Sequence, residues 1–232
     1  MKYKFIIFDA DETLLDFSKA EEFAFKKTMG YFNRDYETEY HFNTYKEINK
    51  NIWGEFEKEL ITAEELKEER FRRLFYKLNM NLDPKEVNIK YIDNLCQGCF
   101  ILDGALELLN DLKGKFKLVL ITNGLTTVQD ARIRKSQIGE FFDAVVISEE
   151  VGVAKPNPDI FEFAFKKAGH NNKESALMVG DSLTSDIKGG MNFGIDTCWY
   201  NPKHLENTTE IKPVYEIHKL NQLKDILFCE NL

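Results

Sequence analysis

The sequence lacks a long hydrophobic run, and none of its apolar stretches approaches the roughly 18 residues that a membrane-spanning helix needs. We expect no signal peptide either, because the chain enters a predicted strand within a few residues of Met1. Internal repeats and low-complexity tracts are also absent from the sequence. These absences exclude an integral membrane protein and favour a globular, cytoplasmic one.

Positive charge is in short supply, with 31 Lys and Arg residues against 39 Asp and Glu residues and a net charge of -8. This balance argues against a general binder of nucleic acids or of anionic membranes. It does not exclude a small phosphorylated substrate, which meets only the local field of its pocket. At 232 residues and 43% hydrophobic composition, the chain suits one domain, or a core domain that carries a smaller insert.

Cysteine is scarce, with four residues in the chain. Cys96 and Cys99 match the pattern C-x-x-C, which occurs in zinc sites and in thiol-redox sites. A structural zinc site normally needs four ligands, and neither a second cysteine pair nor a nearby His-x-x-x-His follows. We therefore interpret these two residues as reduced thiols of an intracellular protein. The other two cysteines are Cys198 and Cys229.

The chain does contain five short apolar runs of the kind that form buried strands, at residues 4–8, 117–121, 144–147, 176–179 and 196–200. Segments with helical periodicity lie between the last four runs. Strands that alternate with helices predict an α/β fold with a mainly parallel sheet and right-handed crossovers, in a Rossmann-like three-layer α/β/α core. After Tyr200 we expect an irregular stretch and a final short helix over residues 220–228.

The gap between the first two runs is far longer than one crossover helix requires, at roughly ninety residues. Two apolar stripes at helical spacing occur there: Phe71, Leu74, Phe75 and Leu78, and Ile48, Ile52 and Phe56. We predict that residues 16–100 form an inserted all-helical cap domain. Residues 1–15 and 101–232 then form the catalytic core.

Polar residues follow four of the predicted strands. In chain order they are Asp9 and Asp11, then Thr122 and Asn123, then Lys155, then Asp181 and Asp186. Each has an ordinary structural explanation by itself, as a turn residue, a helix cap or a solvated charge. The carboxyl ends of parallel strands meet at one edge of a sheet, where ligands bind. Their joint occurrence therefore predicts an active site.

These residue types suit phosphoryl transfer. Asp9 and Asp181 offer the hard oxygen ligands that Mg²⁺ prefers, and the metal would neutralise repulsion between an anionic nucleophile and a phosphate. Lys155 adds fixed positive charge, and Thr122 with nearby backbone N–H groups donates hydrogen bonds to phosphoryl oxygens. Asp9 and Asp11 can divide the work between a nucleophile and a general acid and base.

Four motifs now stand in order: D-x-D-x-T, a strand-end T, K-P and G-D-x-x-x-x-D. On these motifs the chain resembles a haloacid-dehalogenase-type phosphatase over essentially its whole length, and the position of the insert resembles the C1 class of caps. The resemblance implies that Asp9 forms an aspartyl-phosphate. It implies that Asp11 protonates the leaving oxygen and then activates water, while its backbone carbonyl contacts Mg²⁺. Haloacid dehalogenases lack an acid at that position.

The resemblance also implies roles for the later motifs. Thr122 and Lys155 would bind phosphate, with Asn123 beside them. Asp181 would ligate Mg²⁺ directly. Asp186 would orient Lys155 or a metal-bound water, although the roles of the two acids are partly exchanged between families.

The predicted cap is similar to that of bacterial pyrimidine nucleotidases of this superfamily, at residues 45–53, 61–62 and 70–71. The similarity implies hydrolysis of nucleoside 5′-monophosphates. Asn49 and Trp53 are four residues apart on one predicted helical face, so Trp53 would stack on a base while Asn49 binds its edge. Packing inside the cap is the alternative role for Trp53. Alternative functions are a sugar-phosphate phosphatase or phosphomutase on the same core, and a non-catalytic binding module.

Overall fold

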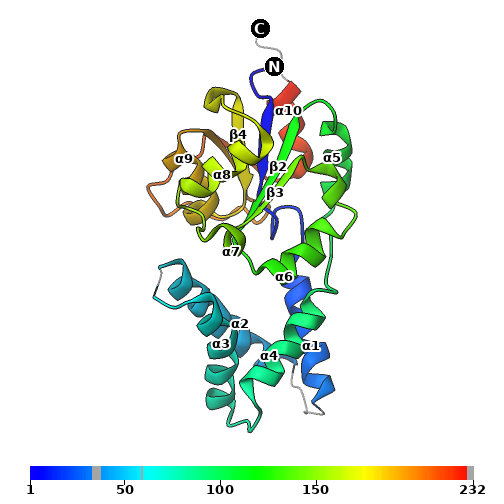
Figure 1. Ribbon diagram of the computed structural model, residues 1–232, viewed down its shortest axis with the longest axis vertical. Helices are drawn as coiled ribbons and strands as arrows, with labels where there is room; N and C mark the ends of the chain where they lie inside the picture. Colours follow the sequence, from blue (N-terminus) through cyan, green and yellow to red (C-terminus); the bar gives the residue numbers. More distant parts are fainter. Residues whose placement is uncertain (33–37, 59, 229–232) are drawn as a thin grey trace. The chain divides into compact units, whose positions relative to one another are not determined.

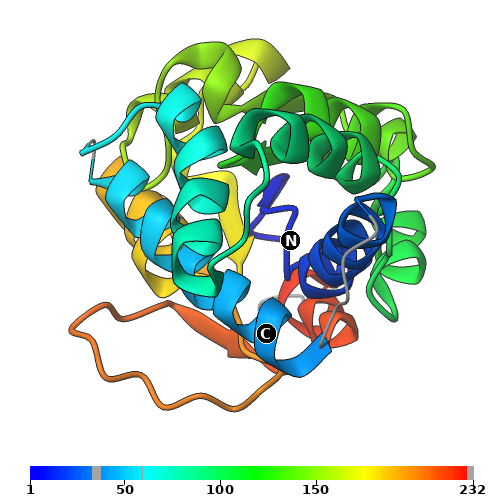
Figure 2. The same ribbon diagram turned by 90° about the horizontal axis from the view of Figure 1, so that it is seen from below.

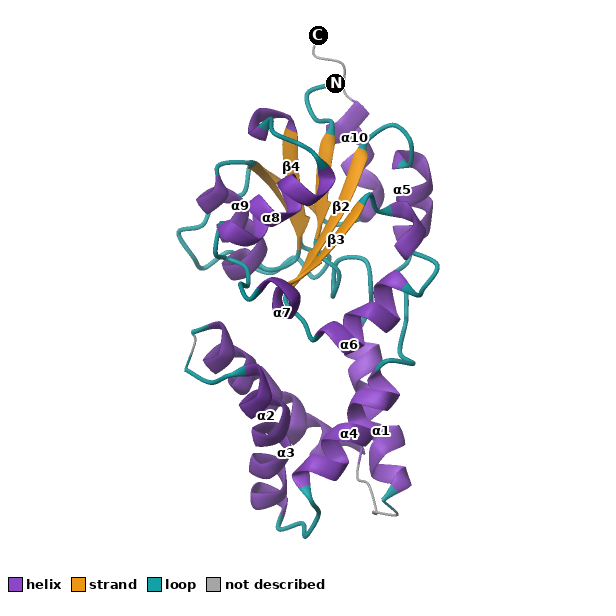
Figure 3. Cartoon of the chain, viewed as in Figure 1, coloured by secondary structure: helices purple, strands orange, loops and turns teal. Residues whose placement is uncertain are grey.

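The computed structural model describes residues 1–32, 38–58 and 60–228. The chain divides into two compact units, one of Met1–Asp16 with Cys99–Leu232 and the other of Phe17–Gly98. Figure 3 shows strands in the first unit, whereas the described part of the second unit consists of helices and loops. None of the helices in the described residues combines the length and the apolarity that a membrane crossing requires.

The first unit is built on a six-stranded parallel sheet with the order β3-β2-β1-β4-β5-β6 (Figure 1). The strands are β1 (Phe5–Phe8), β2 (Lys117–Thr122), β3 (Ala144–Ile147), β4 (Ala176–Gly180), β5 (Asp196–Tyr200) and β6 (Tyr215–Ile217). The predicted α/β fold with a parallel sheet is therefore confirmed. The order makes β1 a central strand, buried on both sides.

One strand was not predicted. The stretch after Tyr200 does run as a long loop, drawn in orange in Figure 2, but it returns to the sheet as β6. Three residues are too few to show a period, and pairing with β5 makes them a strand. The expected C-terminal helix is a short 3₁₀ turn (Leu220–Gln222) followed by α10 (Leu223–Phe228).

Helices cover both faces of the sheet (Figure 1). The helices of the described part of this unit are α5 (Ala105–Leu112), α6 (Thr126–Gln129), α7 (Ser148–Val151), α8 (Asp159–Ala168), α9 (Lys188–Phe193) and α10, with π-helical turns at Asp130–Arg134 and Leu183–Ile187 and 3₁₀ turns at Gly139–Phe141 and Lys173–Ser175. Successive strand residues point to opposite faces. Ile6 and Phe8 accordingly pack in one apolar cluster with α5 and α10. Phe5 and Ile7 pack in the other cluster with α8.

The second unit contains four helices in its described residues: α1 (Phe17–Tyr31), α2 (Thr38–Glu57), α3 (Ala63–Leu78) and α4 (Pro84–Leu95). Helix α1 packs on α4, and helix α2 packs on α3. The two members of each pair lie side by side in Figures 1 and 2. Most of the two apolar stripes is buried in this unit, including Ile52, Phe71 and Leu74. Helix α3 begins with a capping box, in which Thr62 and Glu65 satisfy each other's backbone N–H groups.

Among the described residues, Cys96, Cys99 and Cys198 form no disulfide bond. Cys99 Sγ donates to the carbonyl of Arg132 at 3.3 Å. Cys229 lies outside the described residues.

Candidate active site

Asp9 follows β1 directly, and its backbone still belongs to the sheet, because its N–H donates to the carbonyl of Val179 on β4 at 2.9 Å. The chain then turns sharply at Glu12, whose φ of 61° lies in the left-handed region that non-glycine residues rarely adopt. After this turn, the hydroxyl of Thr13 accepts a hydrogen bond from the N–H of Asp181 at 3.1 Å. This hydrogen bond connects the carboxyl end of β1, which precedes Asp9, to the carboxyl end of β4, which precedes Asp181.

Lys155 is almost fully buried among the strand ends. Its Nζ lies 2.5 Å from Asp9 Oδ1 and 2.7 Å from Asp186 Oδ1, and it donates to the carbonyl of Ile121 at 2.9 Å. The backbone of Lys155 is fixed by Asn123, whose side-chain amide accepts from its N–H and donates to its carbonyl, both at 2.8 Å. The lysine is therefore fixed at both ends of its side chain.

Burial shapes the electrostatics of this cluster. Desolvation, with repulsion from Asp186 and Asp11, outweighs the attraction of Lys155 and raises the pKa of Asp9 to about 7. Desolvation and repulsion from Asp186 and Asp9 raise the pKa of Asp181 to about 8. Burial lowers the pKa of Lys155, but the charges of Asp186 and Asp9 outweigh it and the net pKa is raised. Negative charge is in excess here, and a cation would relieve it.

Carboxylate oxygens of Asp9, Asp181 and Asp186 all lie within 4.8 Å of one another. Three hard oxygen donors at this spacing, two of them with raised pKa values, fit a divalent metal ion. The carboxylate of Asp11 is not part of this group. Asp186 is held close because Gly180 has no side chain: a Cβ there would lie 2.3 Å from Asp186 Oδ2.

The carboxylate of Asp11 is held by two residues of the helical segment that follows β2. Gln129 Nε2 donates to Asp11 Oδ2 and to Thr122 Oγ1, both at 2.8 Å. Arg132, which is 0% exposed, donates from Nη1 to Asp11 Oδ1 at 2.8 Å and to Gln129 Oε1 at 3.2 Å. The structure therefore brings together all seven predicted core residues: Asp9, Asp11, Thr122, Asn123, Lys155, Asp181 and Asp186.

Gln129 and Arg132 were not among the predicted site residues. They are three residues apart and share a helix face, in a segment that changes from α-helical to π-helical geometry after Gln129. The sequence carries no clear signal for them, because the burial of Arg132 is visible only in the folded structure. By sequence alone, Arg132 cannot be told from Arg134, whose side chain is 30% exposed and pairs with Glu150.

The two predicted residues of the second unit are placed differently from each other. Asn49 is only 4% exposed, and its side-chain amide donates to Glu21 at 2.7 Å. This position favours a structural role for Asn49 within the helices, and its contact with a base stays a prediction. Trp53 is half-buried and packs edge-to-face on Phe56.

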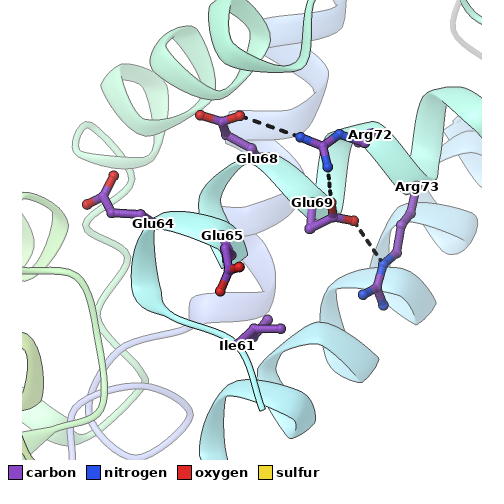
Figure 4. Close-up of a pocket in the computed structure, with 7 residues that line it drawn as sticks. All are labelled: Ile61, Glu64, Glu65, Glu68, Glu69, Arg72 and Arg73. Carbon is purple, nitrogen blue, oxygen red and sulfur yellow. Dashed lines mark hydrogen bonds and ion pairs between the residues drawn. The ribbon is translucent and has the colours of Figure 1, made fainter. Parts of the chain in front are cut away.

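A surface depression of about 550 Å³ lies on the second unit, lined by Ile61, Glu64, Glu65, Glu68, Glu69, Arg72 and Arg73 (Figure 4). Its charges pair with one another at helical spacing, as Arg72 with Glu68 and Arg73 with Glu69. Pairs of this kind are typical of a solvated helix face. The depression contains none of the predicted catalytic residues, and we do not assign it to the active site.

Comparison with known proteins agrees with this geometry. A profile of haloacid dehalogenase-like hydrolases matches residues 3–194. The chain is 38% identical to the pyrimidine 5′-nucleotidase YjjG of Escherichia coli over 98% of its length and 99% of that protein. It is equally identical to the pyrimidine 5′-nucleotidase PynA of Streptococcus pneumoniae, over 98% of this chain and 96% of that one.

A solved structure is also similar over the full length. It is the magnesium-bound HAD-hydrolase YfnB of Bacillus subtilis, with a TM-score of 0.92, 36% identity and coverage of 99% of this chain and 100% of that one. With the motif residues gathered at one sheet edge and the profile match over most of the sequence, the chain belongs to the haloacid dehalogenase-like hydrolase family.

Proposed function

We propose that this protein is a Mg²⁺-dependent phosphatase that hydrolyses nucleoside 5′-monophosphates, with pyrimidine nucleotides as the preferred class. The observation that carries the proposal is the buried contact between Lys155 and Asp9, with Asp181 and Thr122 at the carboxyl ends of the two neighbouring strands. A nucleophilic carboxylate, a fixed cation and a hydroxyl donor then surround one position, as phosphoryl transfer requires. The names of the nucleotidases with 38% identity support the substrate class.

In this proposal, Asp9, Asp11 and Lys155 carry out the formation and the hydrolysis of an aspartyl-phosphate. Lys155 donates to Oδ1 of Asp9, so we assign Oδ2 to the attack on phosphorus. As the aspartyl-phosphate forms, the bond from phosphorus to the leaving oxygen breaks and Asp11 gives that oxygen a proton. Asp11 then takes a proton from the water that attacks phosphorus, and the bond to Asp9 breaks.

Thr122 and Lys155 hold the phosphoryl oxygens through both steps. Mg²⁺ bound by Asp9, Asp181 and the backbone carbonyl of Asp11 would offset the negative charge of the phosphate and the carboxylates. Asp186 orients Lys155 in this scheme, which their 2.7 Å contact supports.

We infer that residues 16–100 are a C1-type cap that supplies substrate specificity. Trp53 is its candidate base-stacking residue, because its ring is not fully buried among the helices. Replacing it by alanine should raise KM for nucleotides and leave kcat nearly unchanged, since stacking stabilises ground and transition states alike.

The test is phosphate release from a panel of nucleoside monophosphates and sugar phosphates, with Mg²⁺ and with EDTA. We expect metal-dependent release that favours UMP, dUMP or dTMP, and no turnover by Asp9→Asn. A preference for sugar phosphates would keep the catalytic assignments and replace the substrate class by the alternative one. Full activity of Asp9→Asn would refute the aspartyl-phosphate mechanism.

A further inference from the structure

Four side chains form a continuous hydrogen-bonded group beside the reacting position: Asp11, Thr122, Gln129 and Arg132. Two of them have assigned catalytic roles, and the other two do not. Gln129 and Arg132 are both buried, on the helical segment that follows β2. Both contact the residues with assigned roles, Asp11 and Thr122, directly or through each other.

The hydrogen bonds of Gln129 leave its amide a single orientation. Its two N–H bonds go to Asp11 Oδ2 and Thr122 Oγ1, while its carbonyl oxygen accepts from Arg132. Turning the amide over would place its oxygen against the carboxylate and its N–H₂ group against the guanidinium. The Thr122 hydroxyl therefore acts as an acceptor toward Gln129, and its only proton is left to donate to a phosphoryl oxygen.

Arg132 acts on the other side of Asp11. Its guanidinium is fully buried, whereas a quarter of the Asp11 side chain is exposed. Oδ2 of Asp11 thus accepts a hydrogen bond from Gln129, and Oδ1 accepts one from Arg132. These two hydrogen bonds prevent rotation of the carboxylate. Each carboxylate oxygen has a second lone pair, so Asp11 can still bind a proton on its exposed side.

We propose that Gln129 and Arg132 are positioning residues that hold the acid–base carboxylate of Asp11 and the phosphate-binding hydroxyl of Thr122 as one rigid unit. The inference rests on the proposed function. In that reaction Asp11 must deliver a proton to the leaving oxygen while Thr122 holds the phosphoryl group. The distance between the Asp11 carboxylate and the Thr122 hydroxyl therefore matters in the formation and in the hydrolysis of the aspartyl-phosphate. A small misplacement of a general acid lowers the rate much more than the binding of substrate.

The test compares two substrates that differ in their need for an acid. Loss of a nucleoside requires protonation of an alkoxide, whereas p-nitrophenolate leaves p-nitrophenyl phosphate without a proton. In Arg132→Met we expect kcat/KM for UMP to fall about 10-fold to 100-fold more than kcat/KM for p-nitrophenyl phosphate. KM for UMP should change little, and Arg132→Lys should restore part of the loss.

Two further variants complete the design. Gln129→Met removes all the bonds of the amide at nearly constant volume, and it carries the test if Arg132→Met does not fold. Arg134→Met is the matched control, because this arginine lies two positions along the same turn and pairs with Glu150 at the partly exposed surface. It should leave both substrates unaffected.

The outcomes separate the two proposals. A wild-type protein that releases no phosphate from nucleotides would refute the proposed function itself. An active wild type whose folded Arg132 and Gln129 variants lose the same factor on both substrates would overturn the positioning role, since general damage to the fold does not depend on the leaving group. A loss that is at least about 10-fold larger for UMP than for p-nitrophenyl phosphate supports it.

Discussion

The ammonium of Lys155 lies 2.5 Å from a carboxylate oxygen of Asp9, and both side chains are almost completely removed from solvent. Such a pair is costly to form in the interior, and removing one partner leaves the other charge uncompensated. Asp186 shares the same ammonium, so two buried acids depend on one lysine.

We therefore expect Lys155→Met to lose both activity and stability. The free energy of unfolding without metal should fall by about 3–5 kcal/mol, the usual result of leaving a buried charge unpaired. Denaturant unfolding in EDTA measures this change, and Mg²⁺ should recover part of it. Lys167→Met serves as a control with a small effect, because this lysine on α8 is exposed and donates to the carbonyl of Val145. Unchanged stability of Lys155→Met would show that the pair contributes nothing.

The raised pKa values predict how metal binding depends on pH. Asp9 and Asp181 keep protons in the folded, metal-free protein up to pH values near 7 and 8, while the unfolded chain loses them near 4. Their contribution to stability is complete below about pH 4 and is lost as pH rises through 7 and 8. Metal binding needs the ionised acids, so stabilisation by Mg²⁺ should grow over the same range.

Melting temperatures measured at pH 5, 6, 7 and 8 in EDTA and in Mg²⁺ check this prediction. The difference between the two conditions should widen with pH in the wild type, and it should be much smaller at every pH in Asp181→Asn. A difference that stays constant from pH 5 to 8 would contradict the assignment of these acids.

Gly180 supplies the space in which Asp186 sits, so Gly180→Ala should move the acid. A Cβ 2.3 Å from a carboxylate oxygen requires a shift of the side chain or of the backbone. We expect a loss of about 1–3 kcal/mol in stability, typical of overpacking, together with a lower kcat. Gly30→Ala in α1 is the matched control, because its Cβ would meet nothing within 4 Å and alanine favours a helix. Equal behaviour of the two variants would refute the prediction.

Asn123 was predicted to bind substrate, and the structure shows it bound to the backbone of Lys155. Asn123→Ala should release the loop that carries the lysine, with a loss of about 1 kcal/mol for each of the two hydrogen bonds and a reduced kcat. Asn123→Asp keeps the acceptor for the N–H of Lys155 and loses the donor to its carbonyl, so its effect should be intermediate in unfolding and in kinetics. A change in KM alone, with stability intact, would instead indicate direct contact with substrate.

Much of the core was predictable because its chemistry lies at strand ends. Buried runs such as residues 144–147 become strands over the predicted residues, and each motif follows one of them. Strand β6 was missed because its three residues owe their conformation to pairing with β5. Arg132 was missed for a related reason: its burial depends on Asp11, which is 121 positions away in the chain. The burial of Asn49 was likewise not predictable, since helical spacing alone does not tell an exposed face from one that packs against Glu21.

The hydrogen bond from the N–H of Asp9 to Val179 has a consequence for dynamics. Asp9, the proposed nucleophile, directly follows β1, which pairs with β2 and β4, and its N–H extends the hydrogen bonding to β4. Freeing its backbone therefore requires the centre of the sheet to open. Amide exchange at Asp9 should accordingly be as slow as exchange in the deepest strands, which proceeds by global unfolding. The carboxylate that we propose to attack phosphorus is thereby positioned by the most stable part of the fold rather than by a loop.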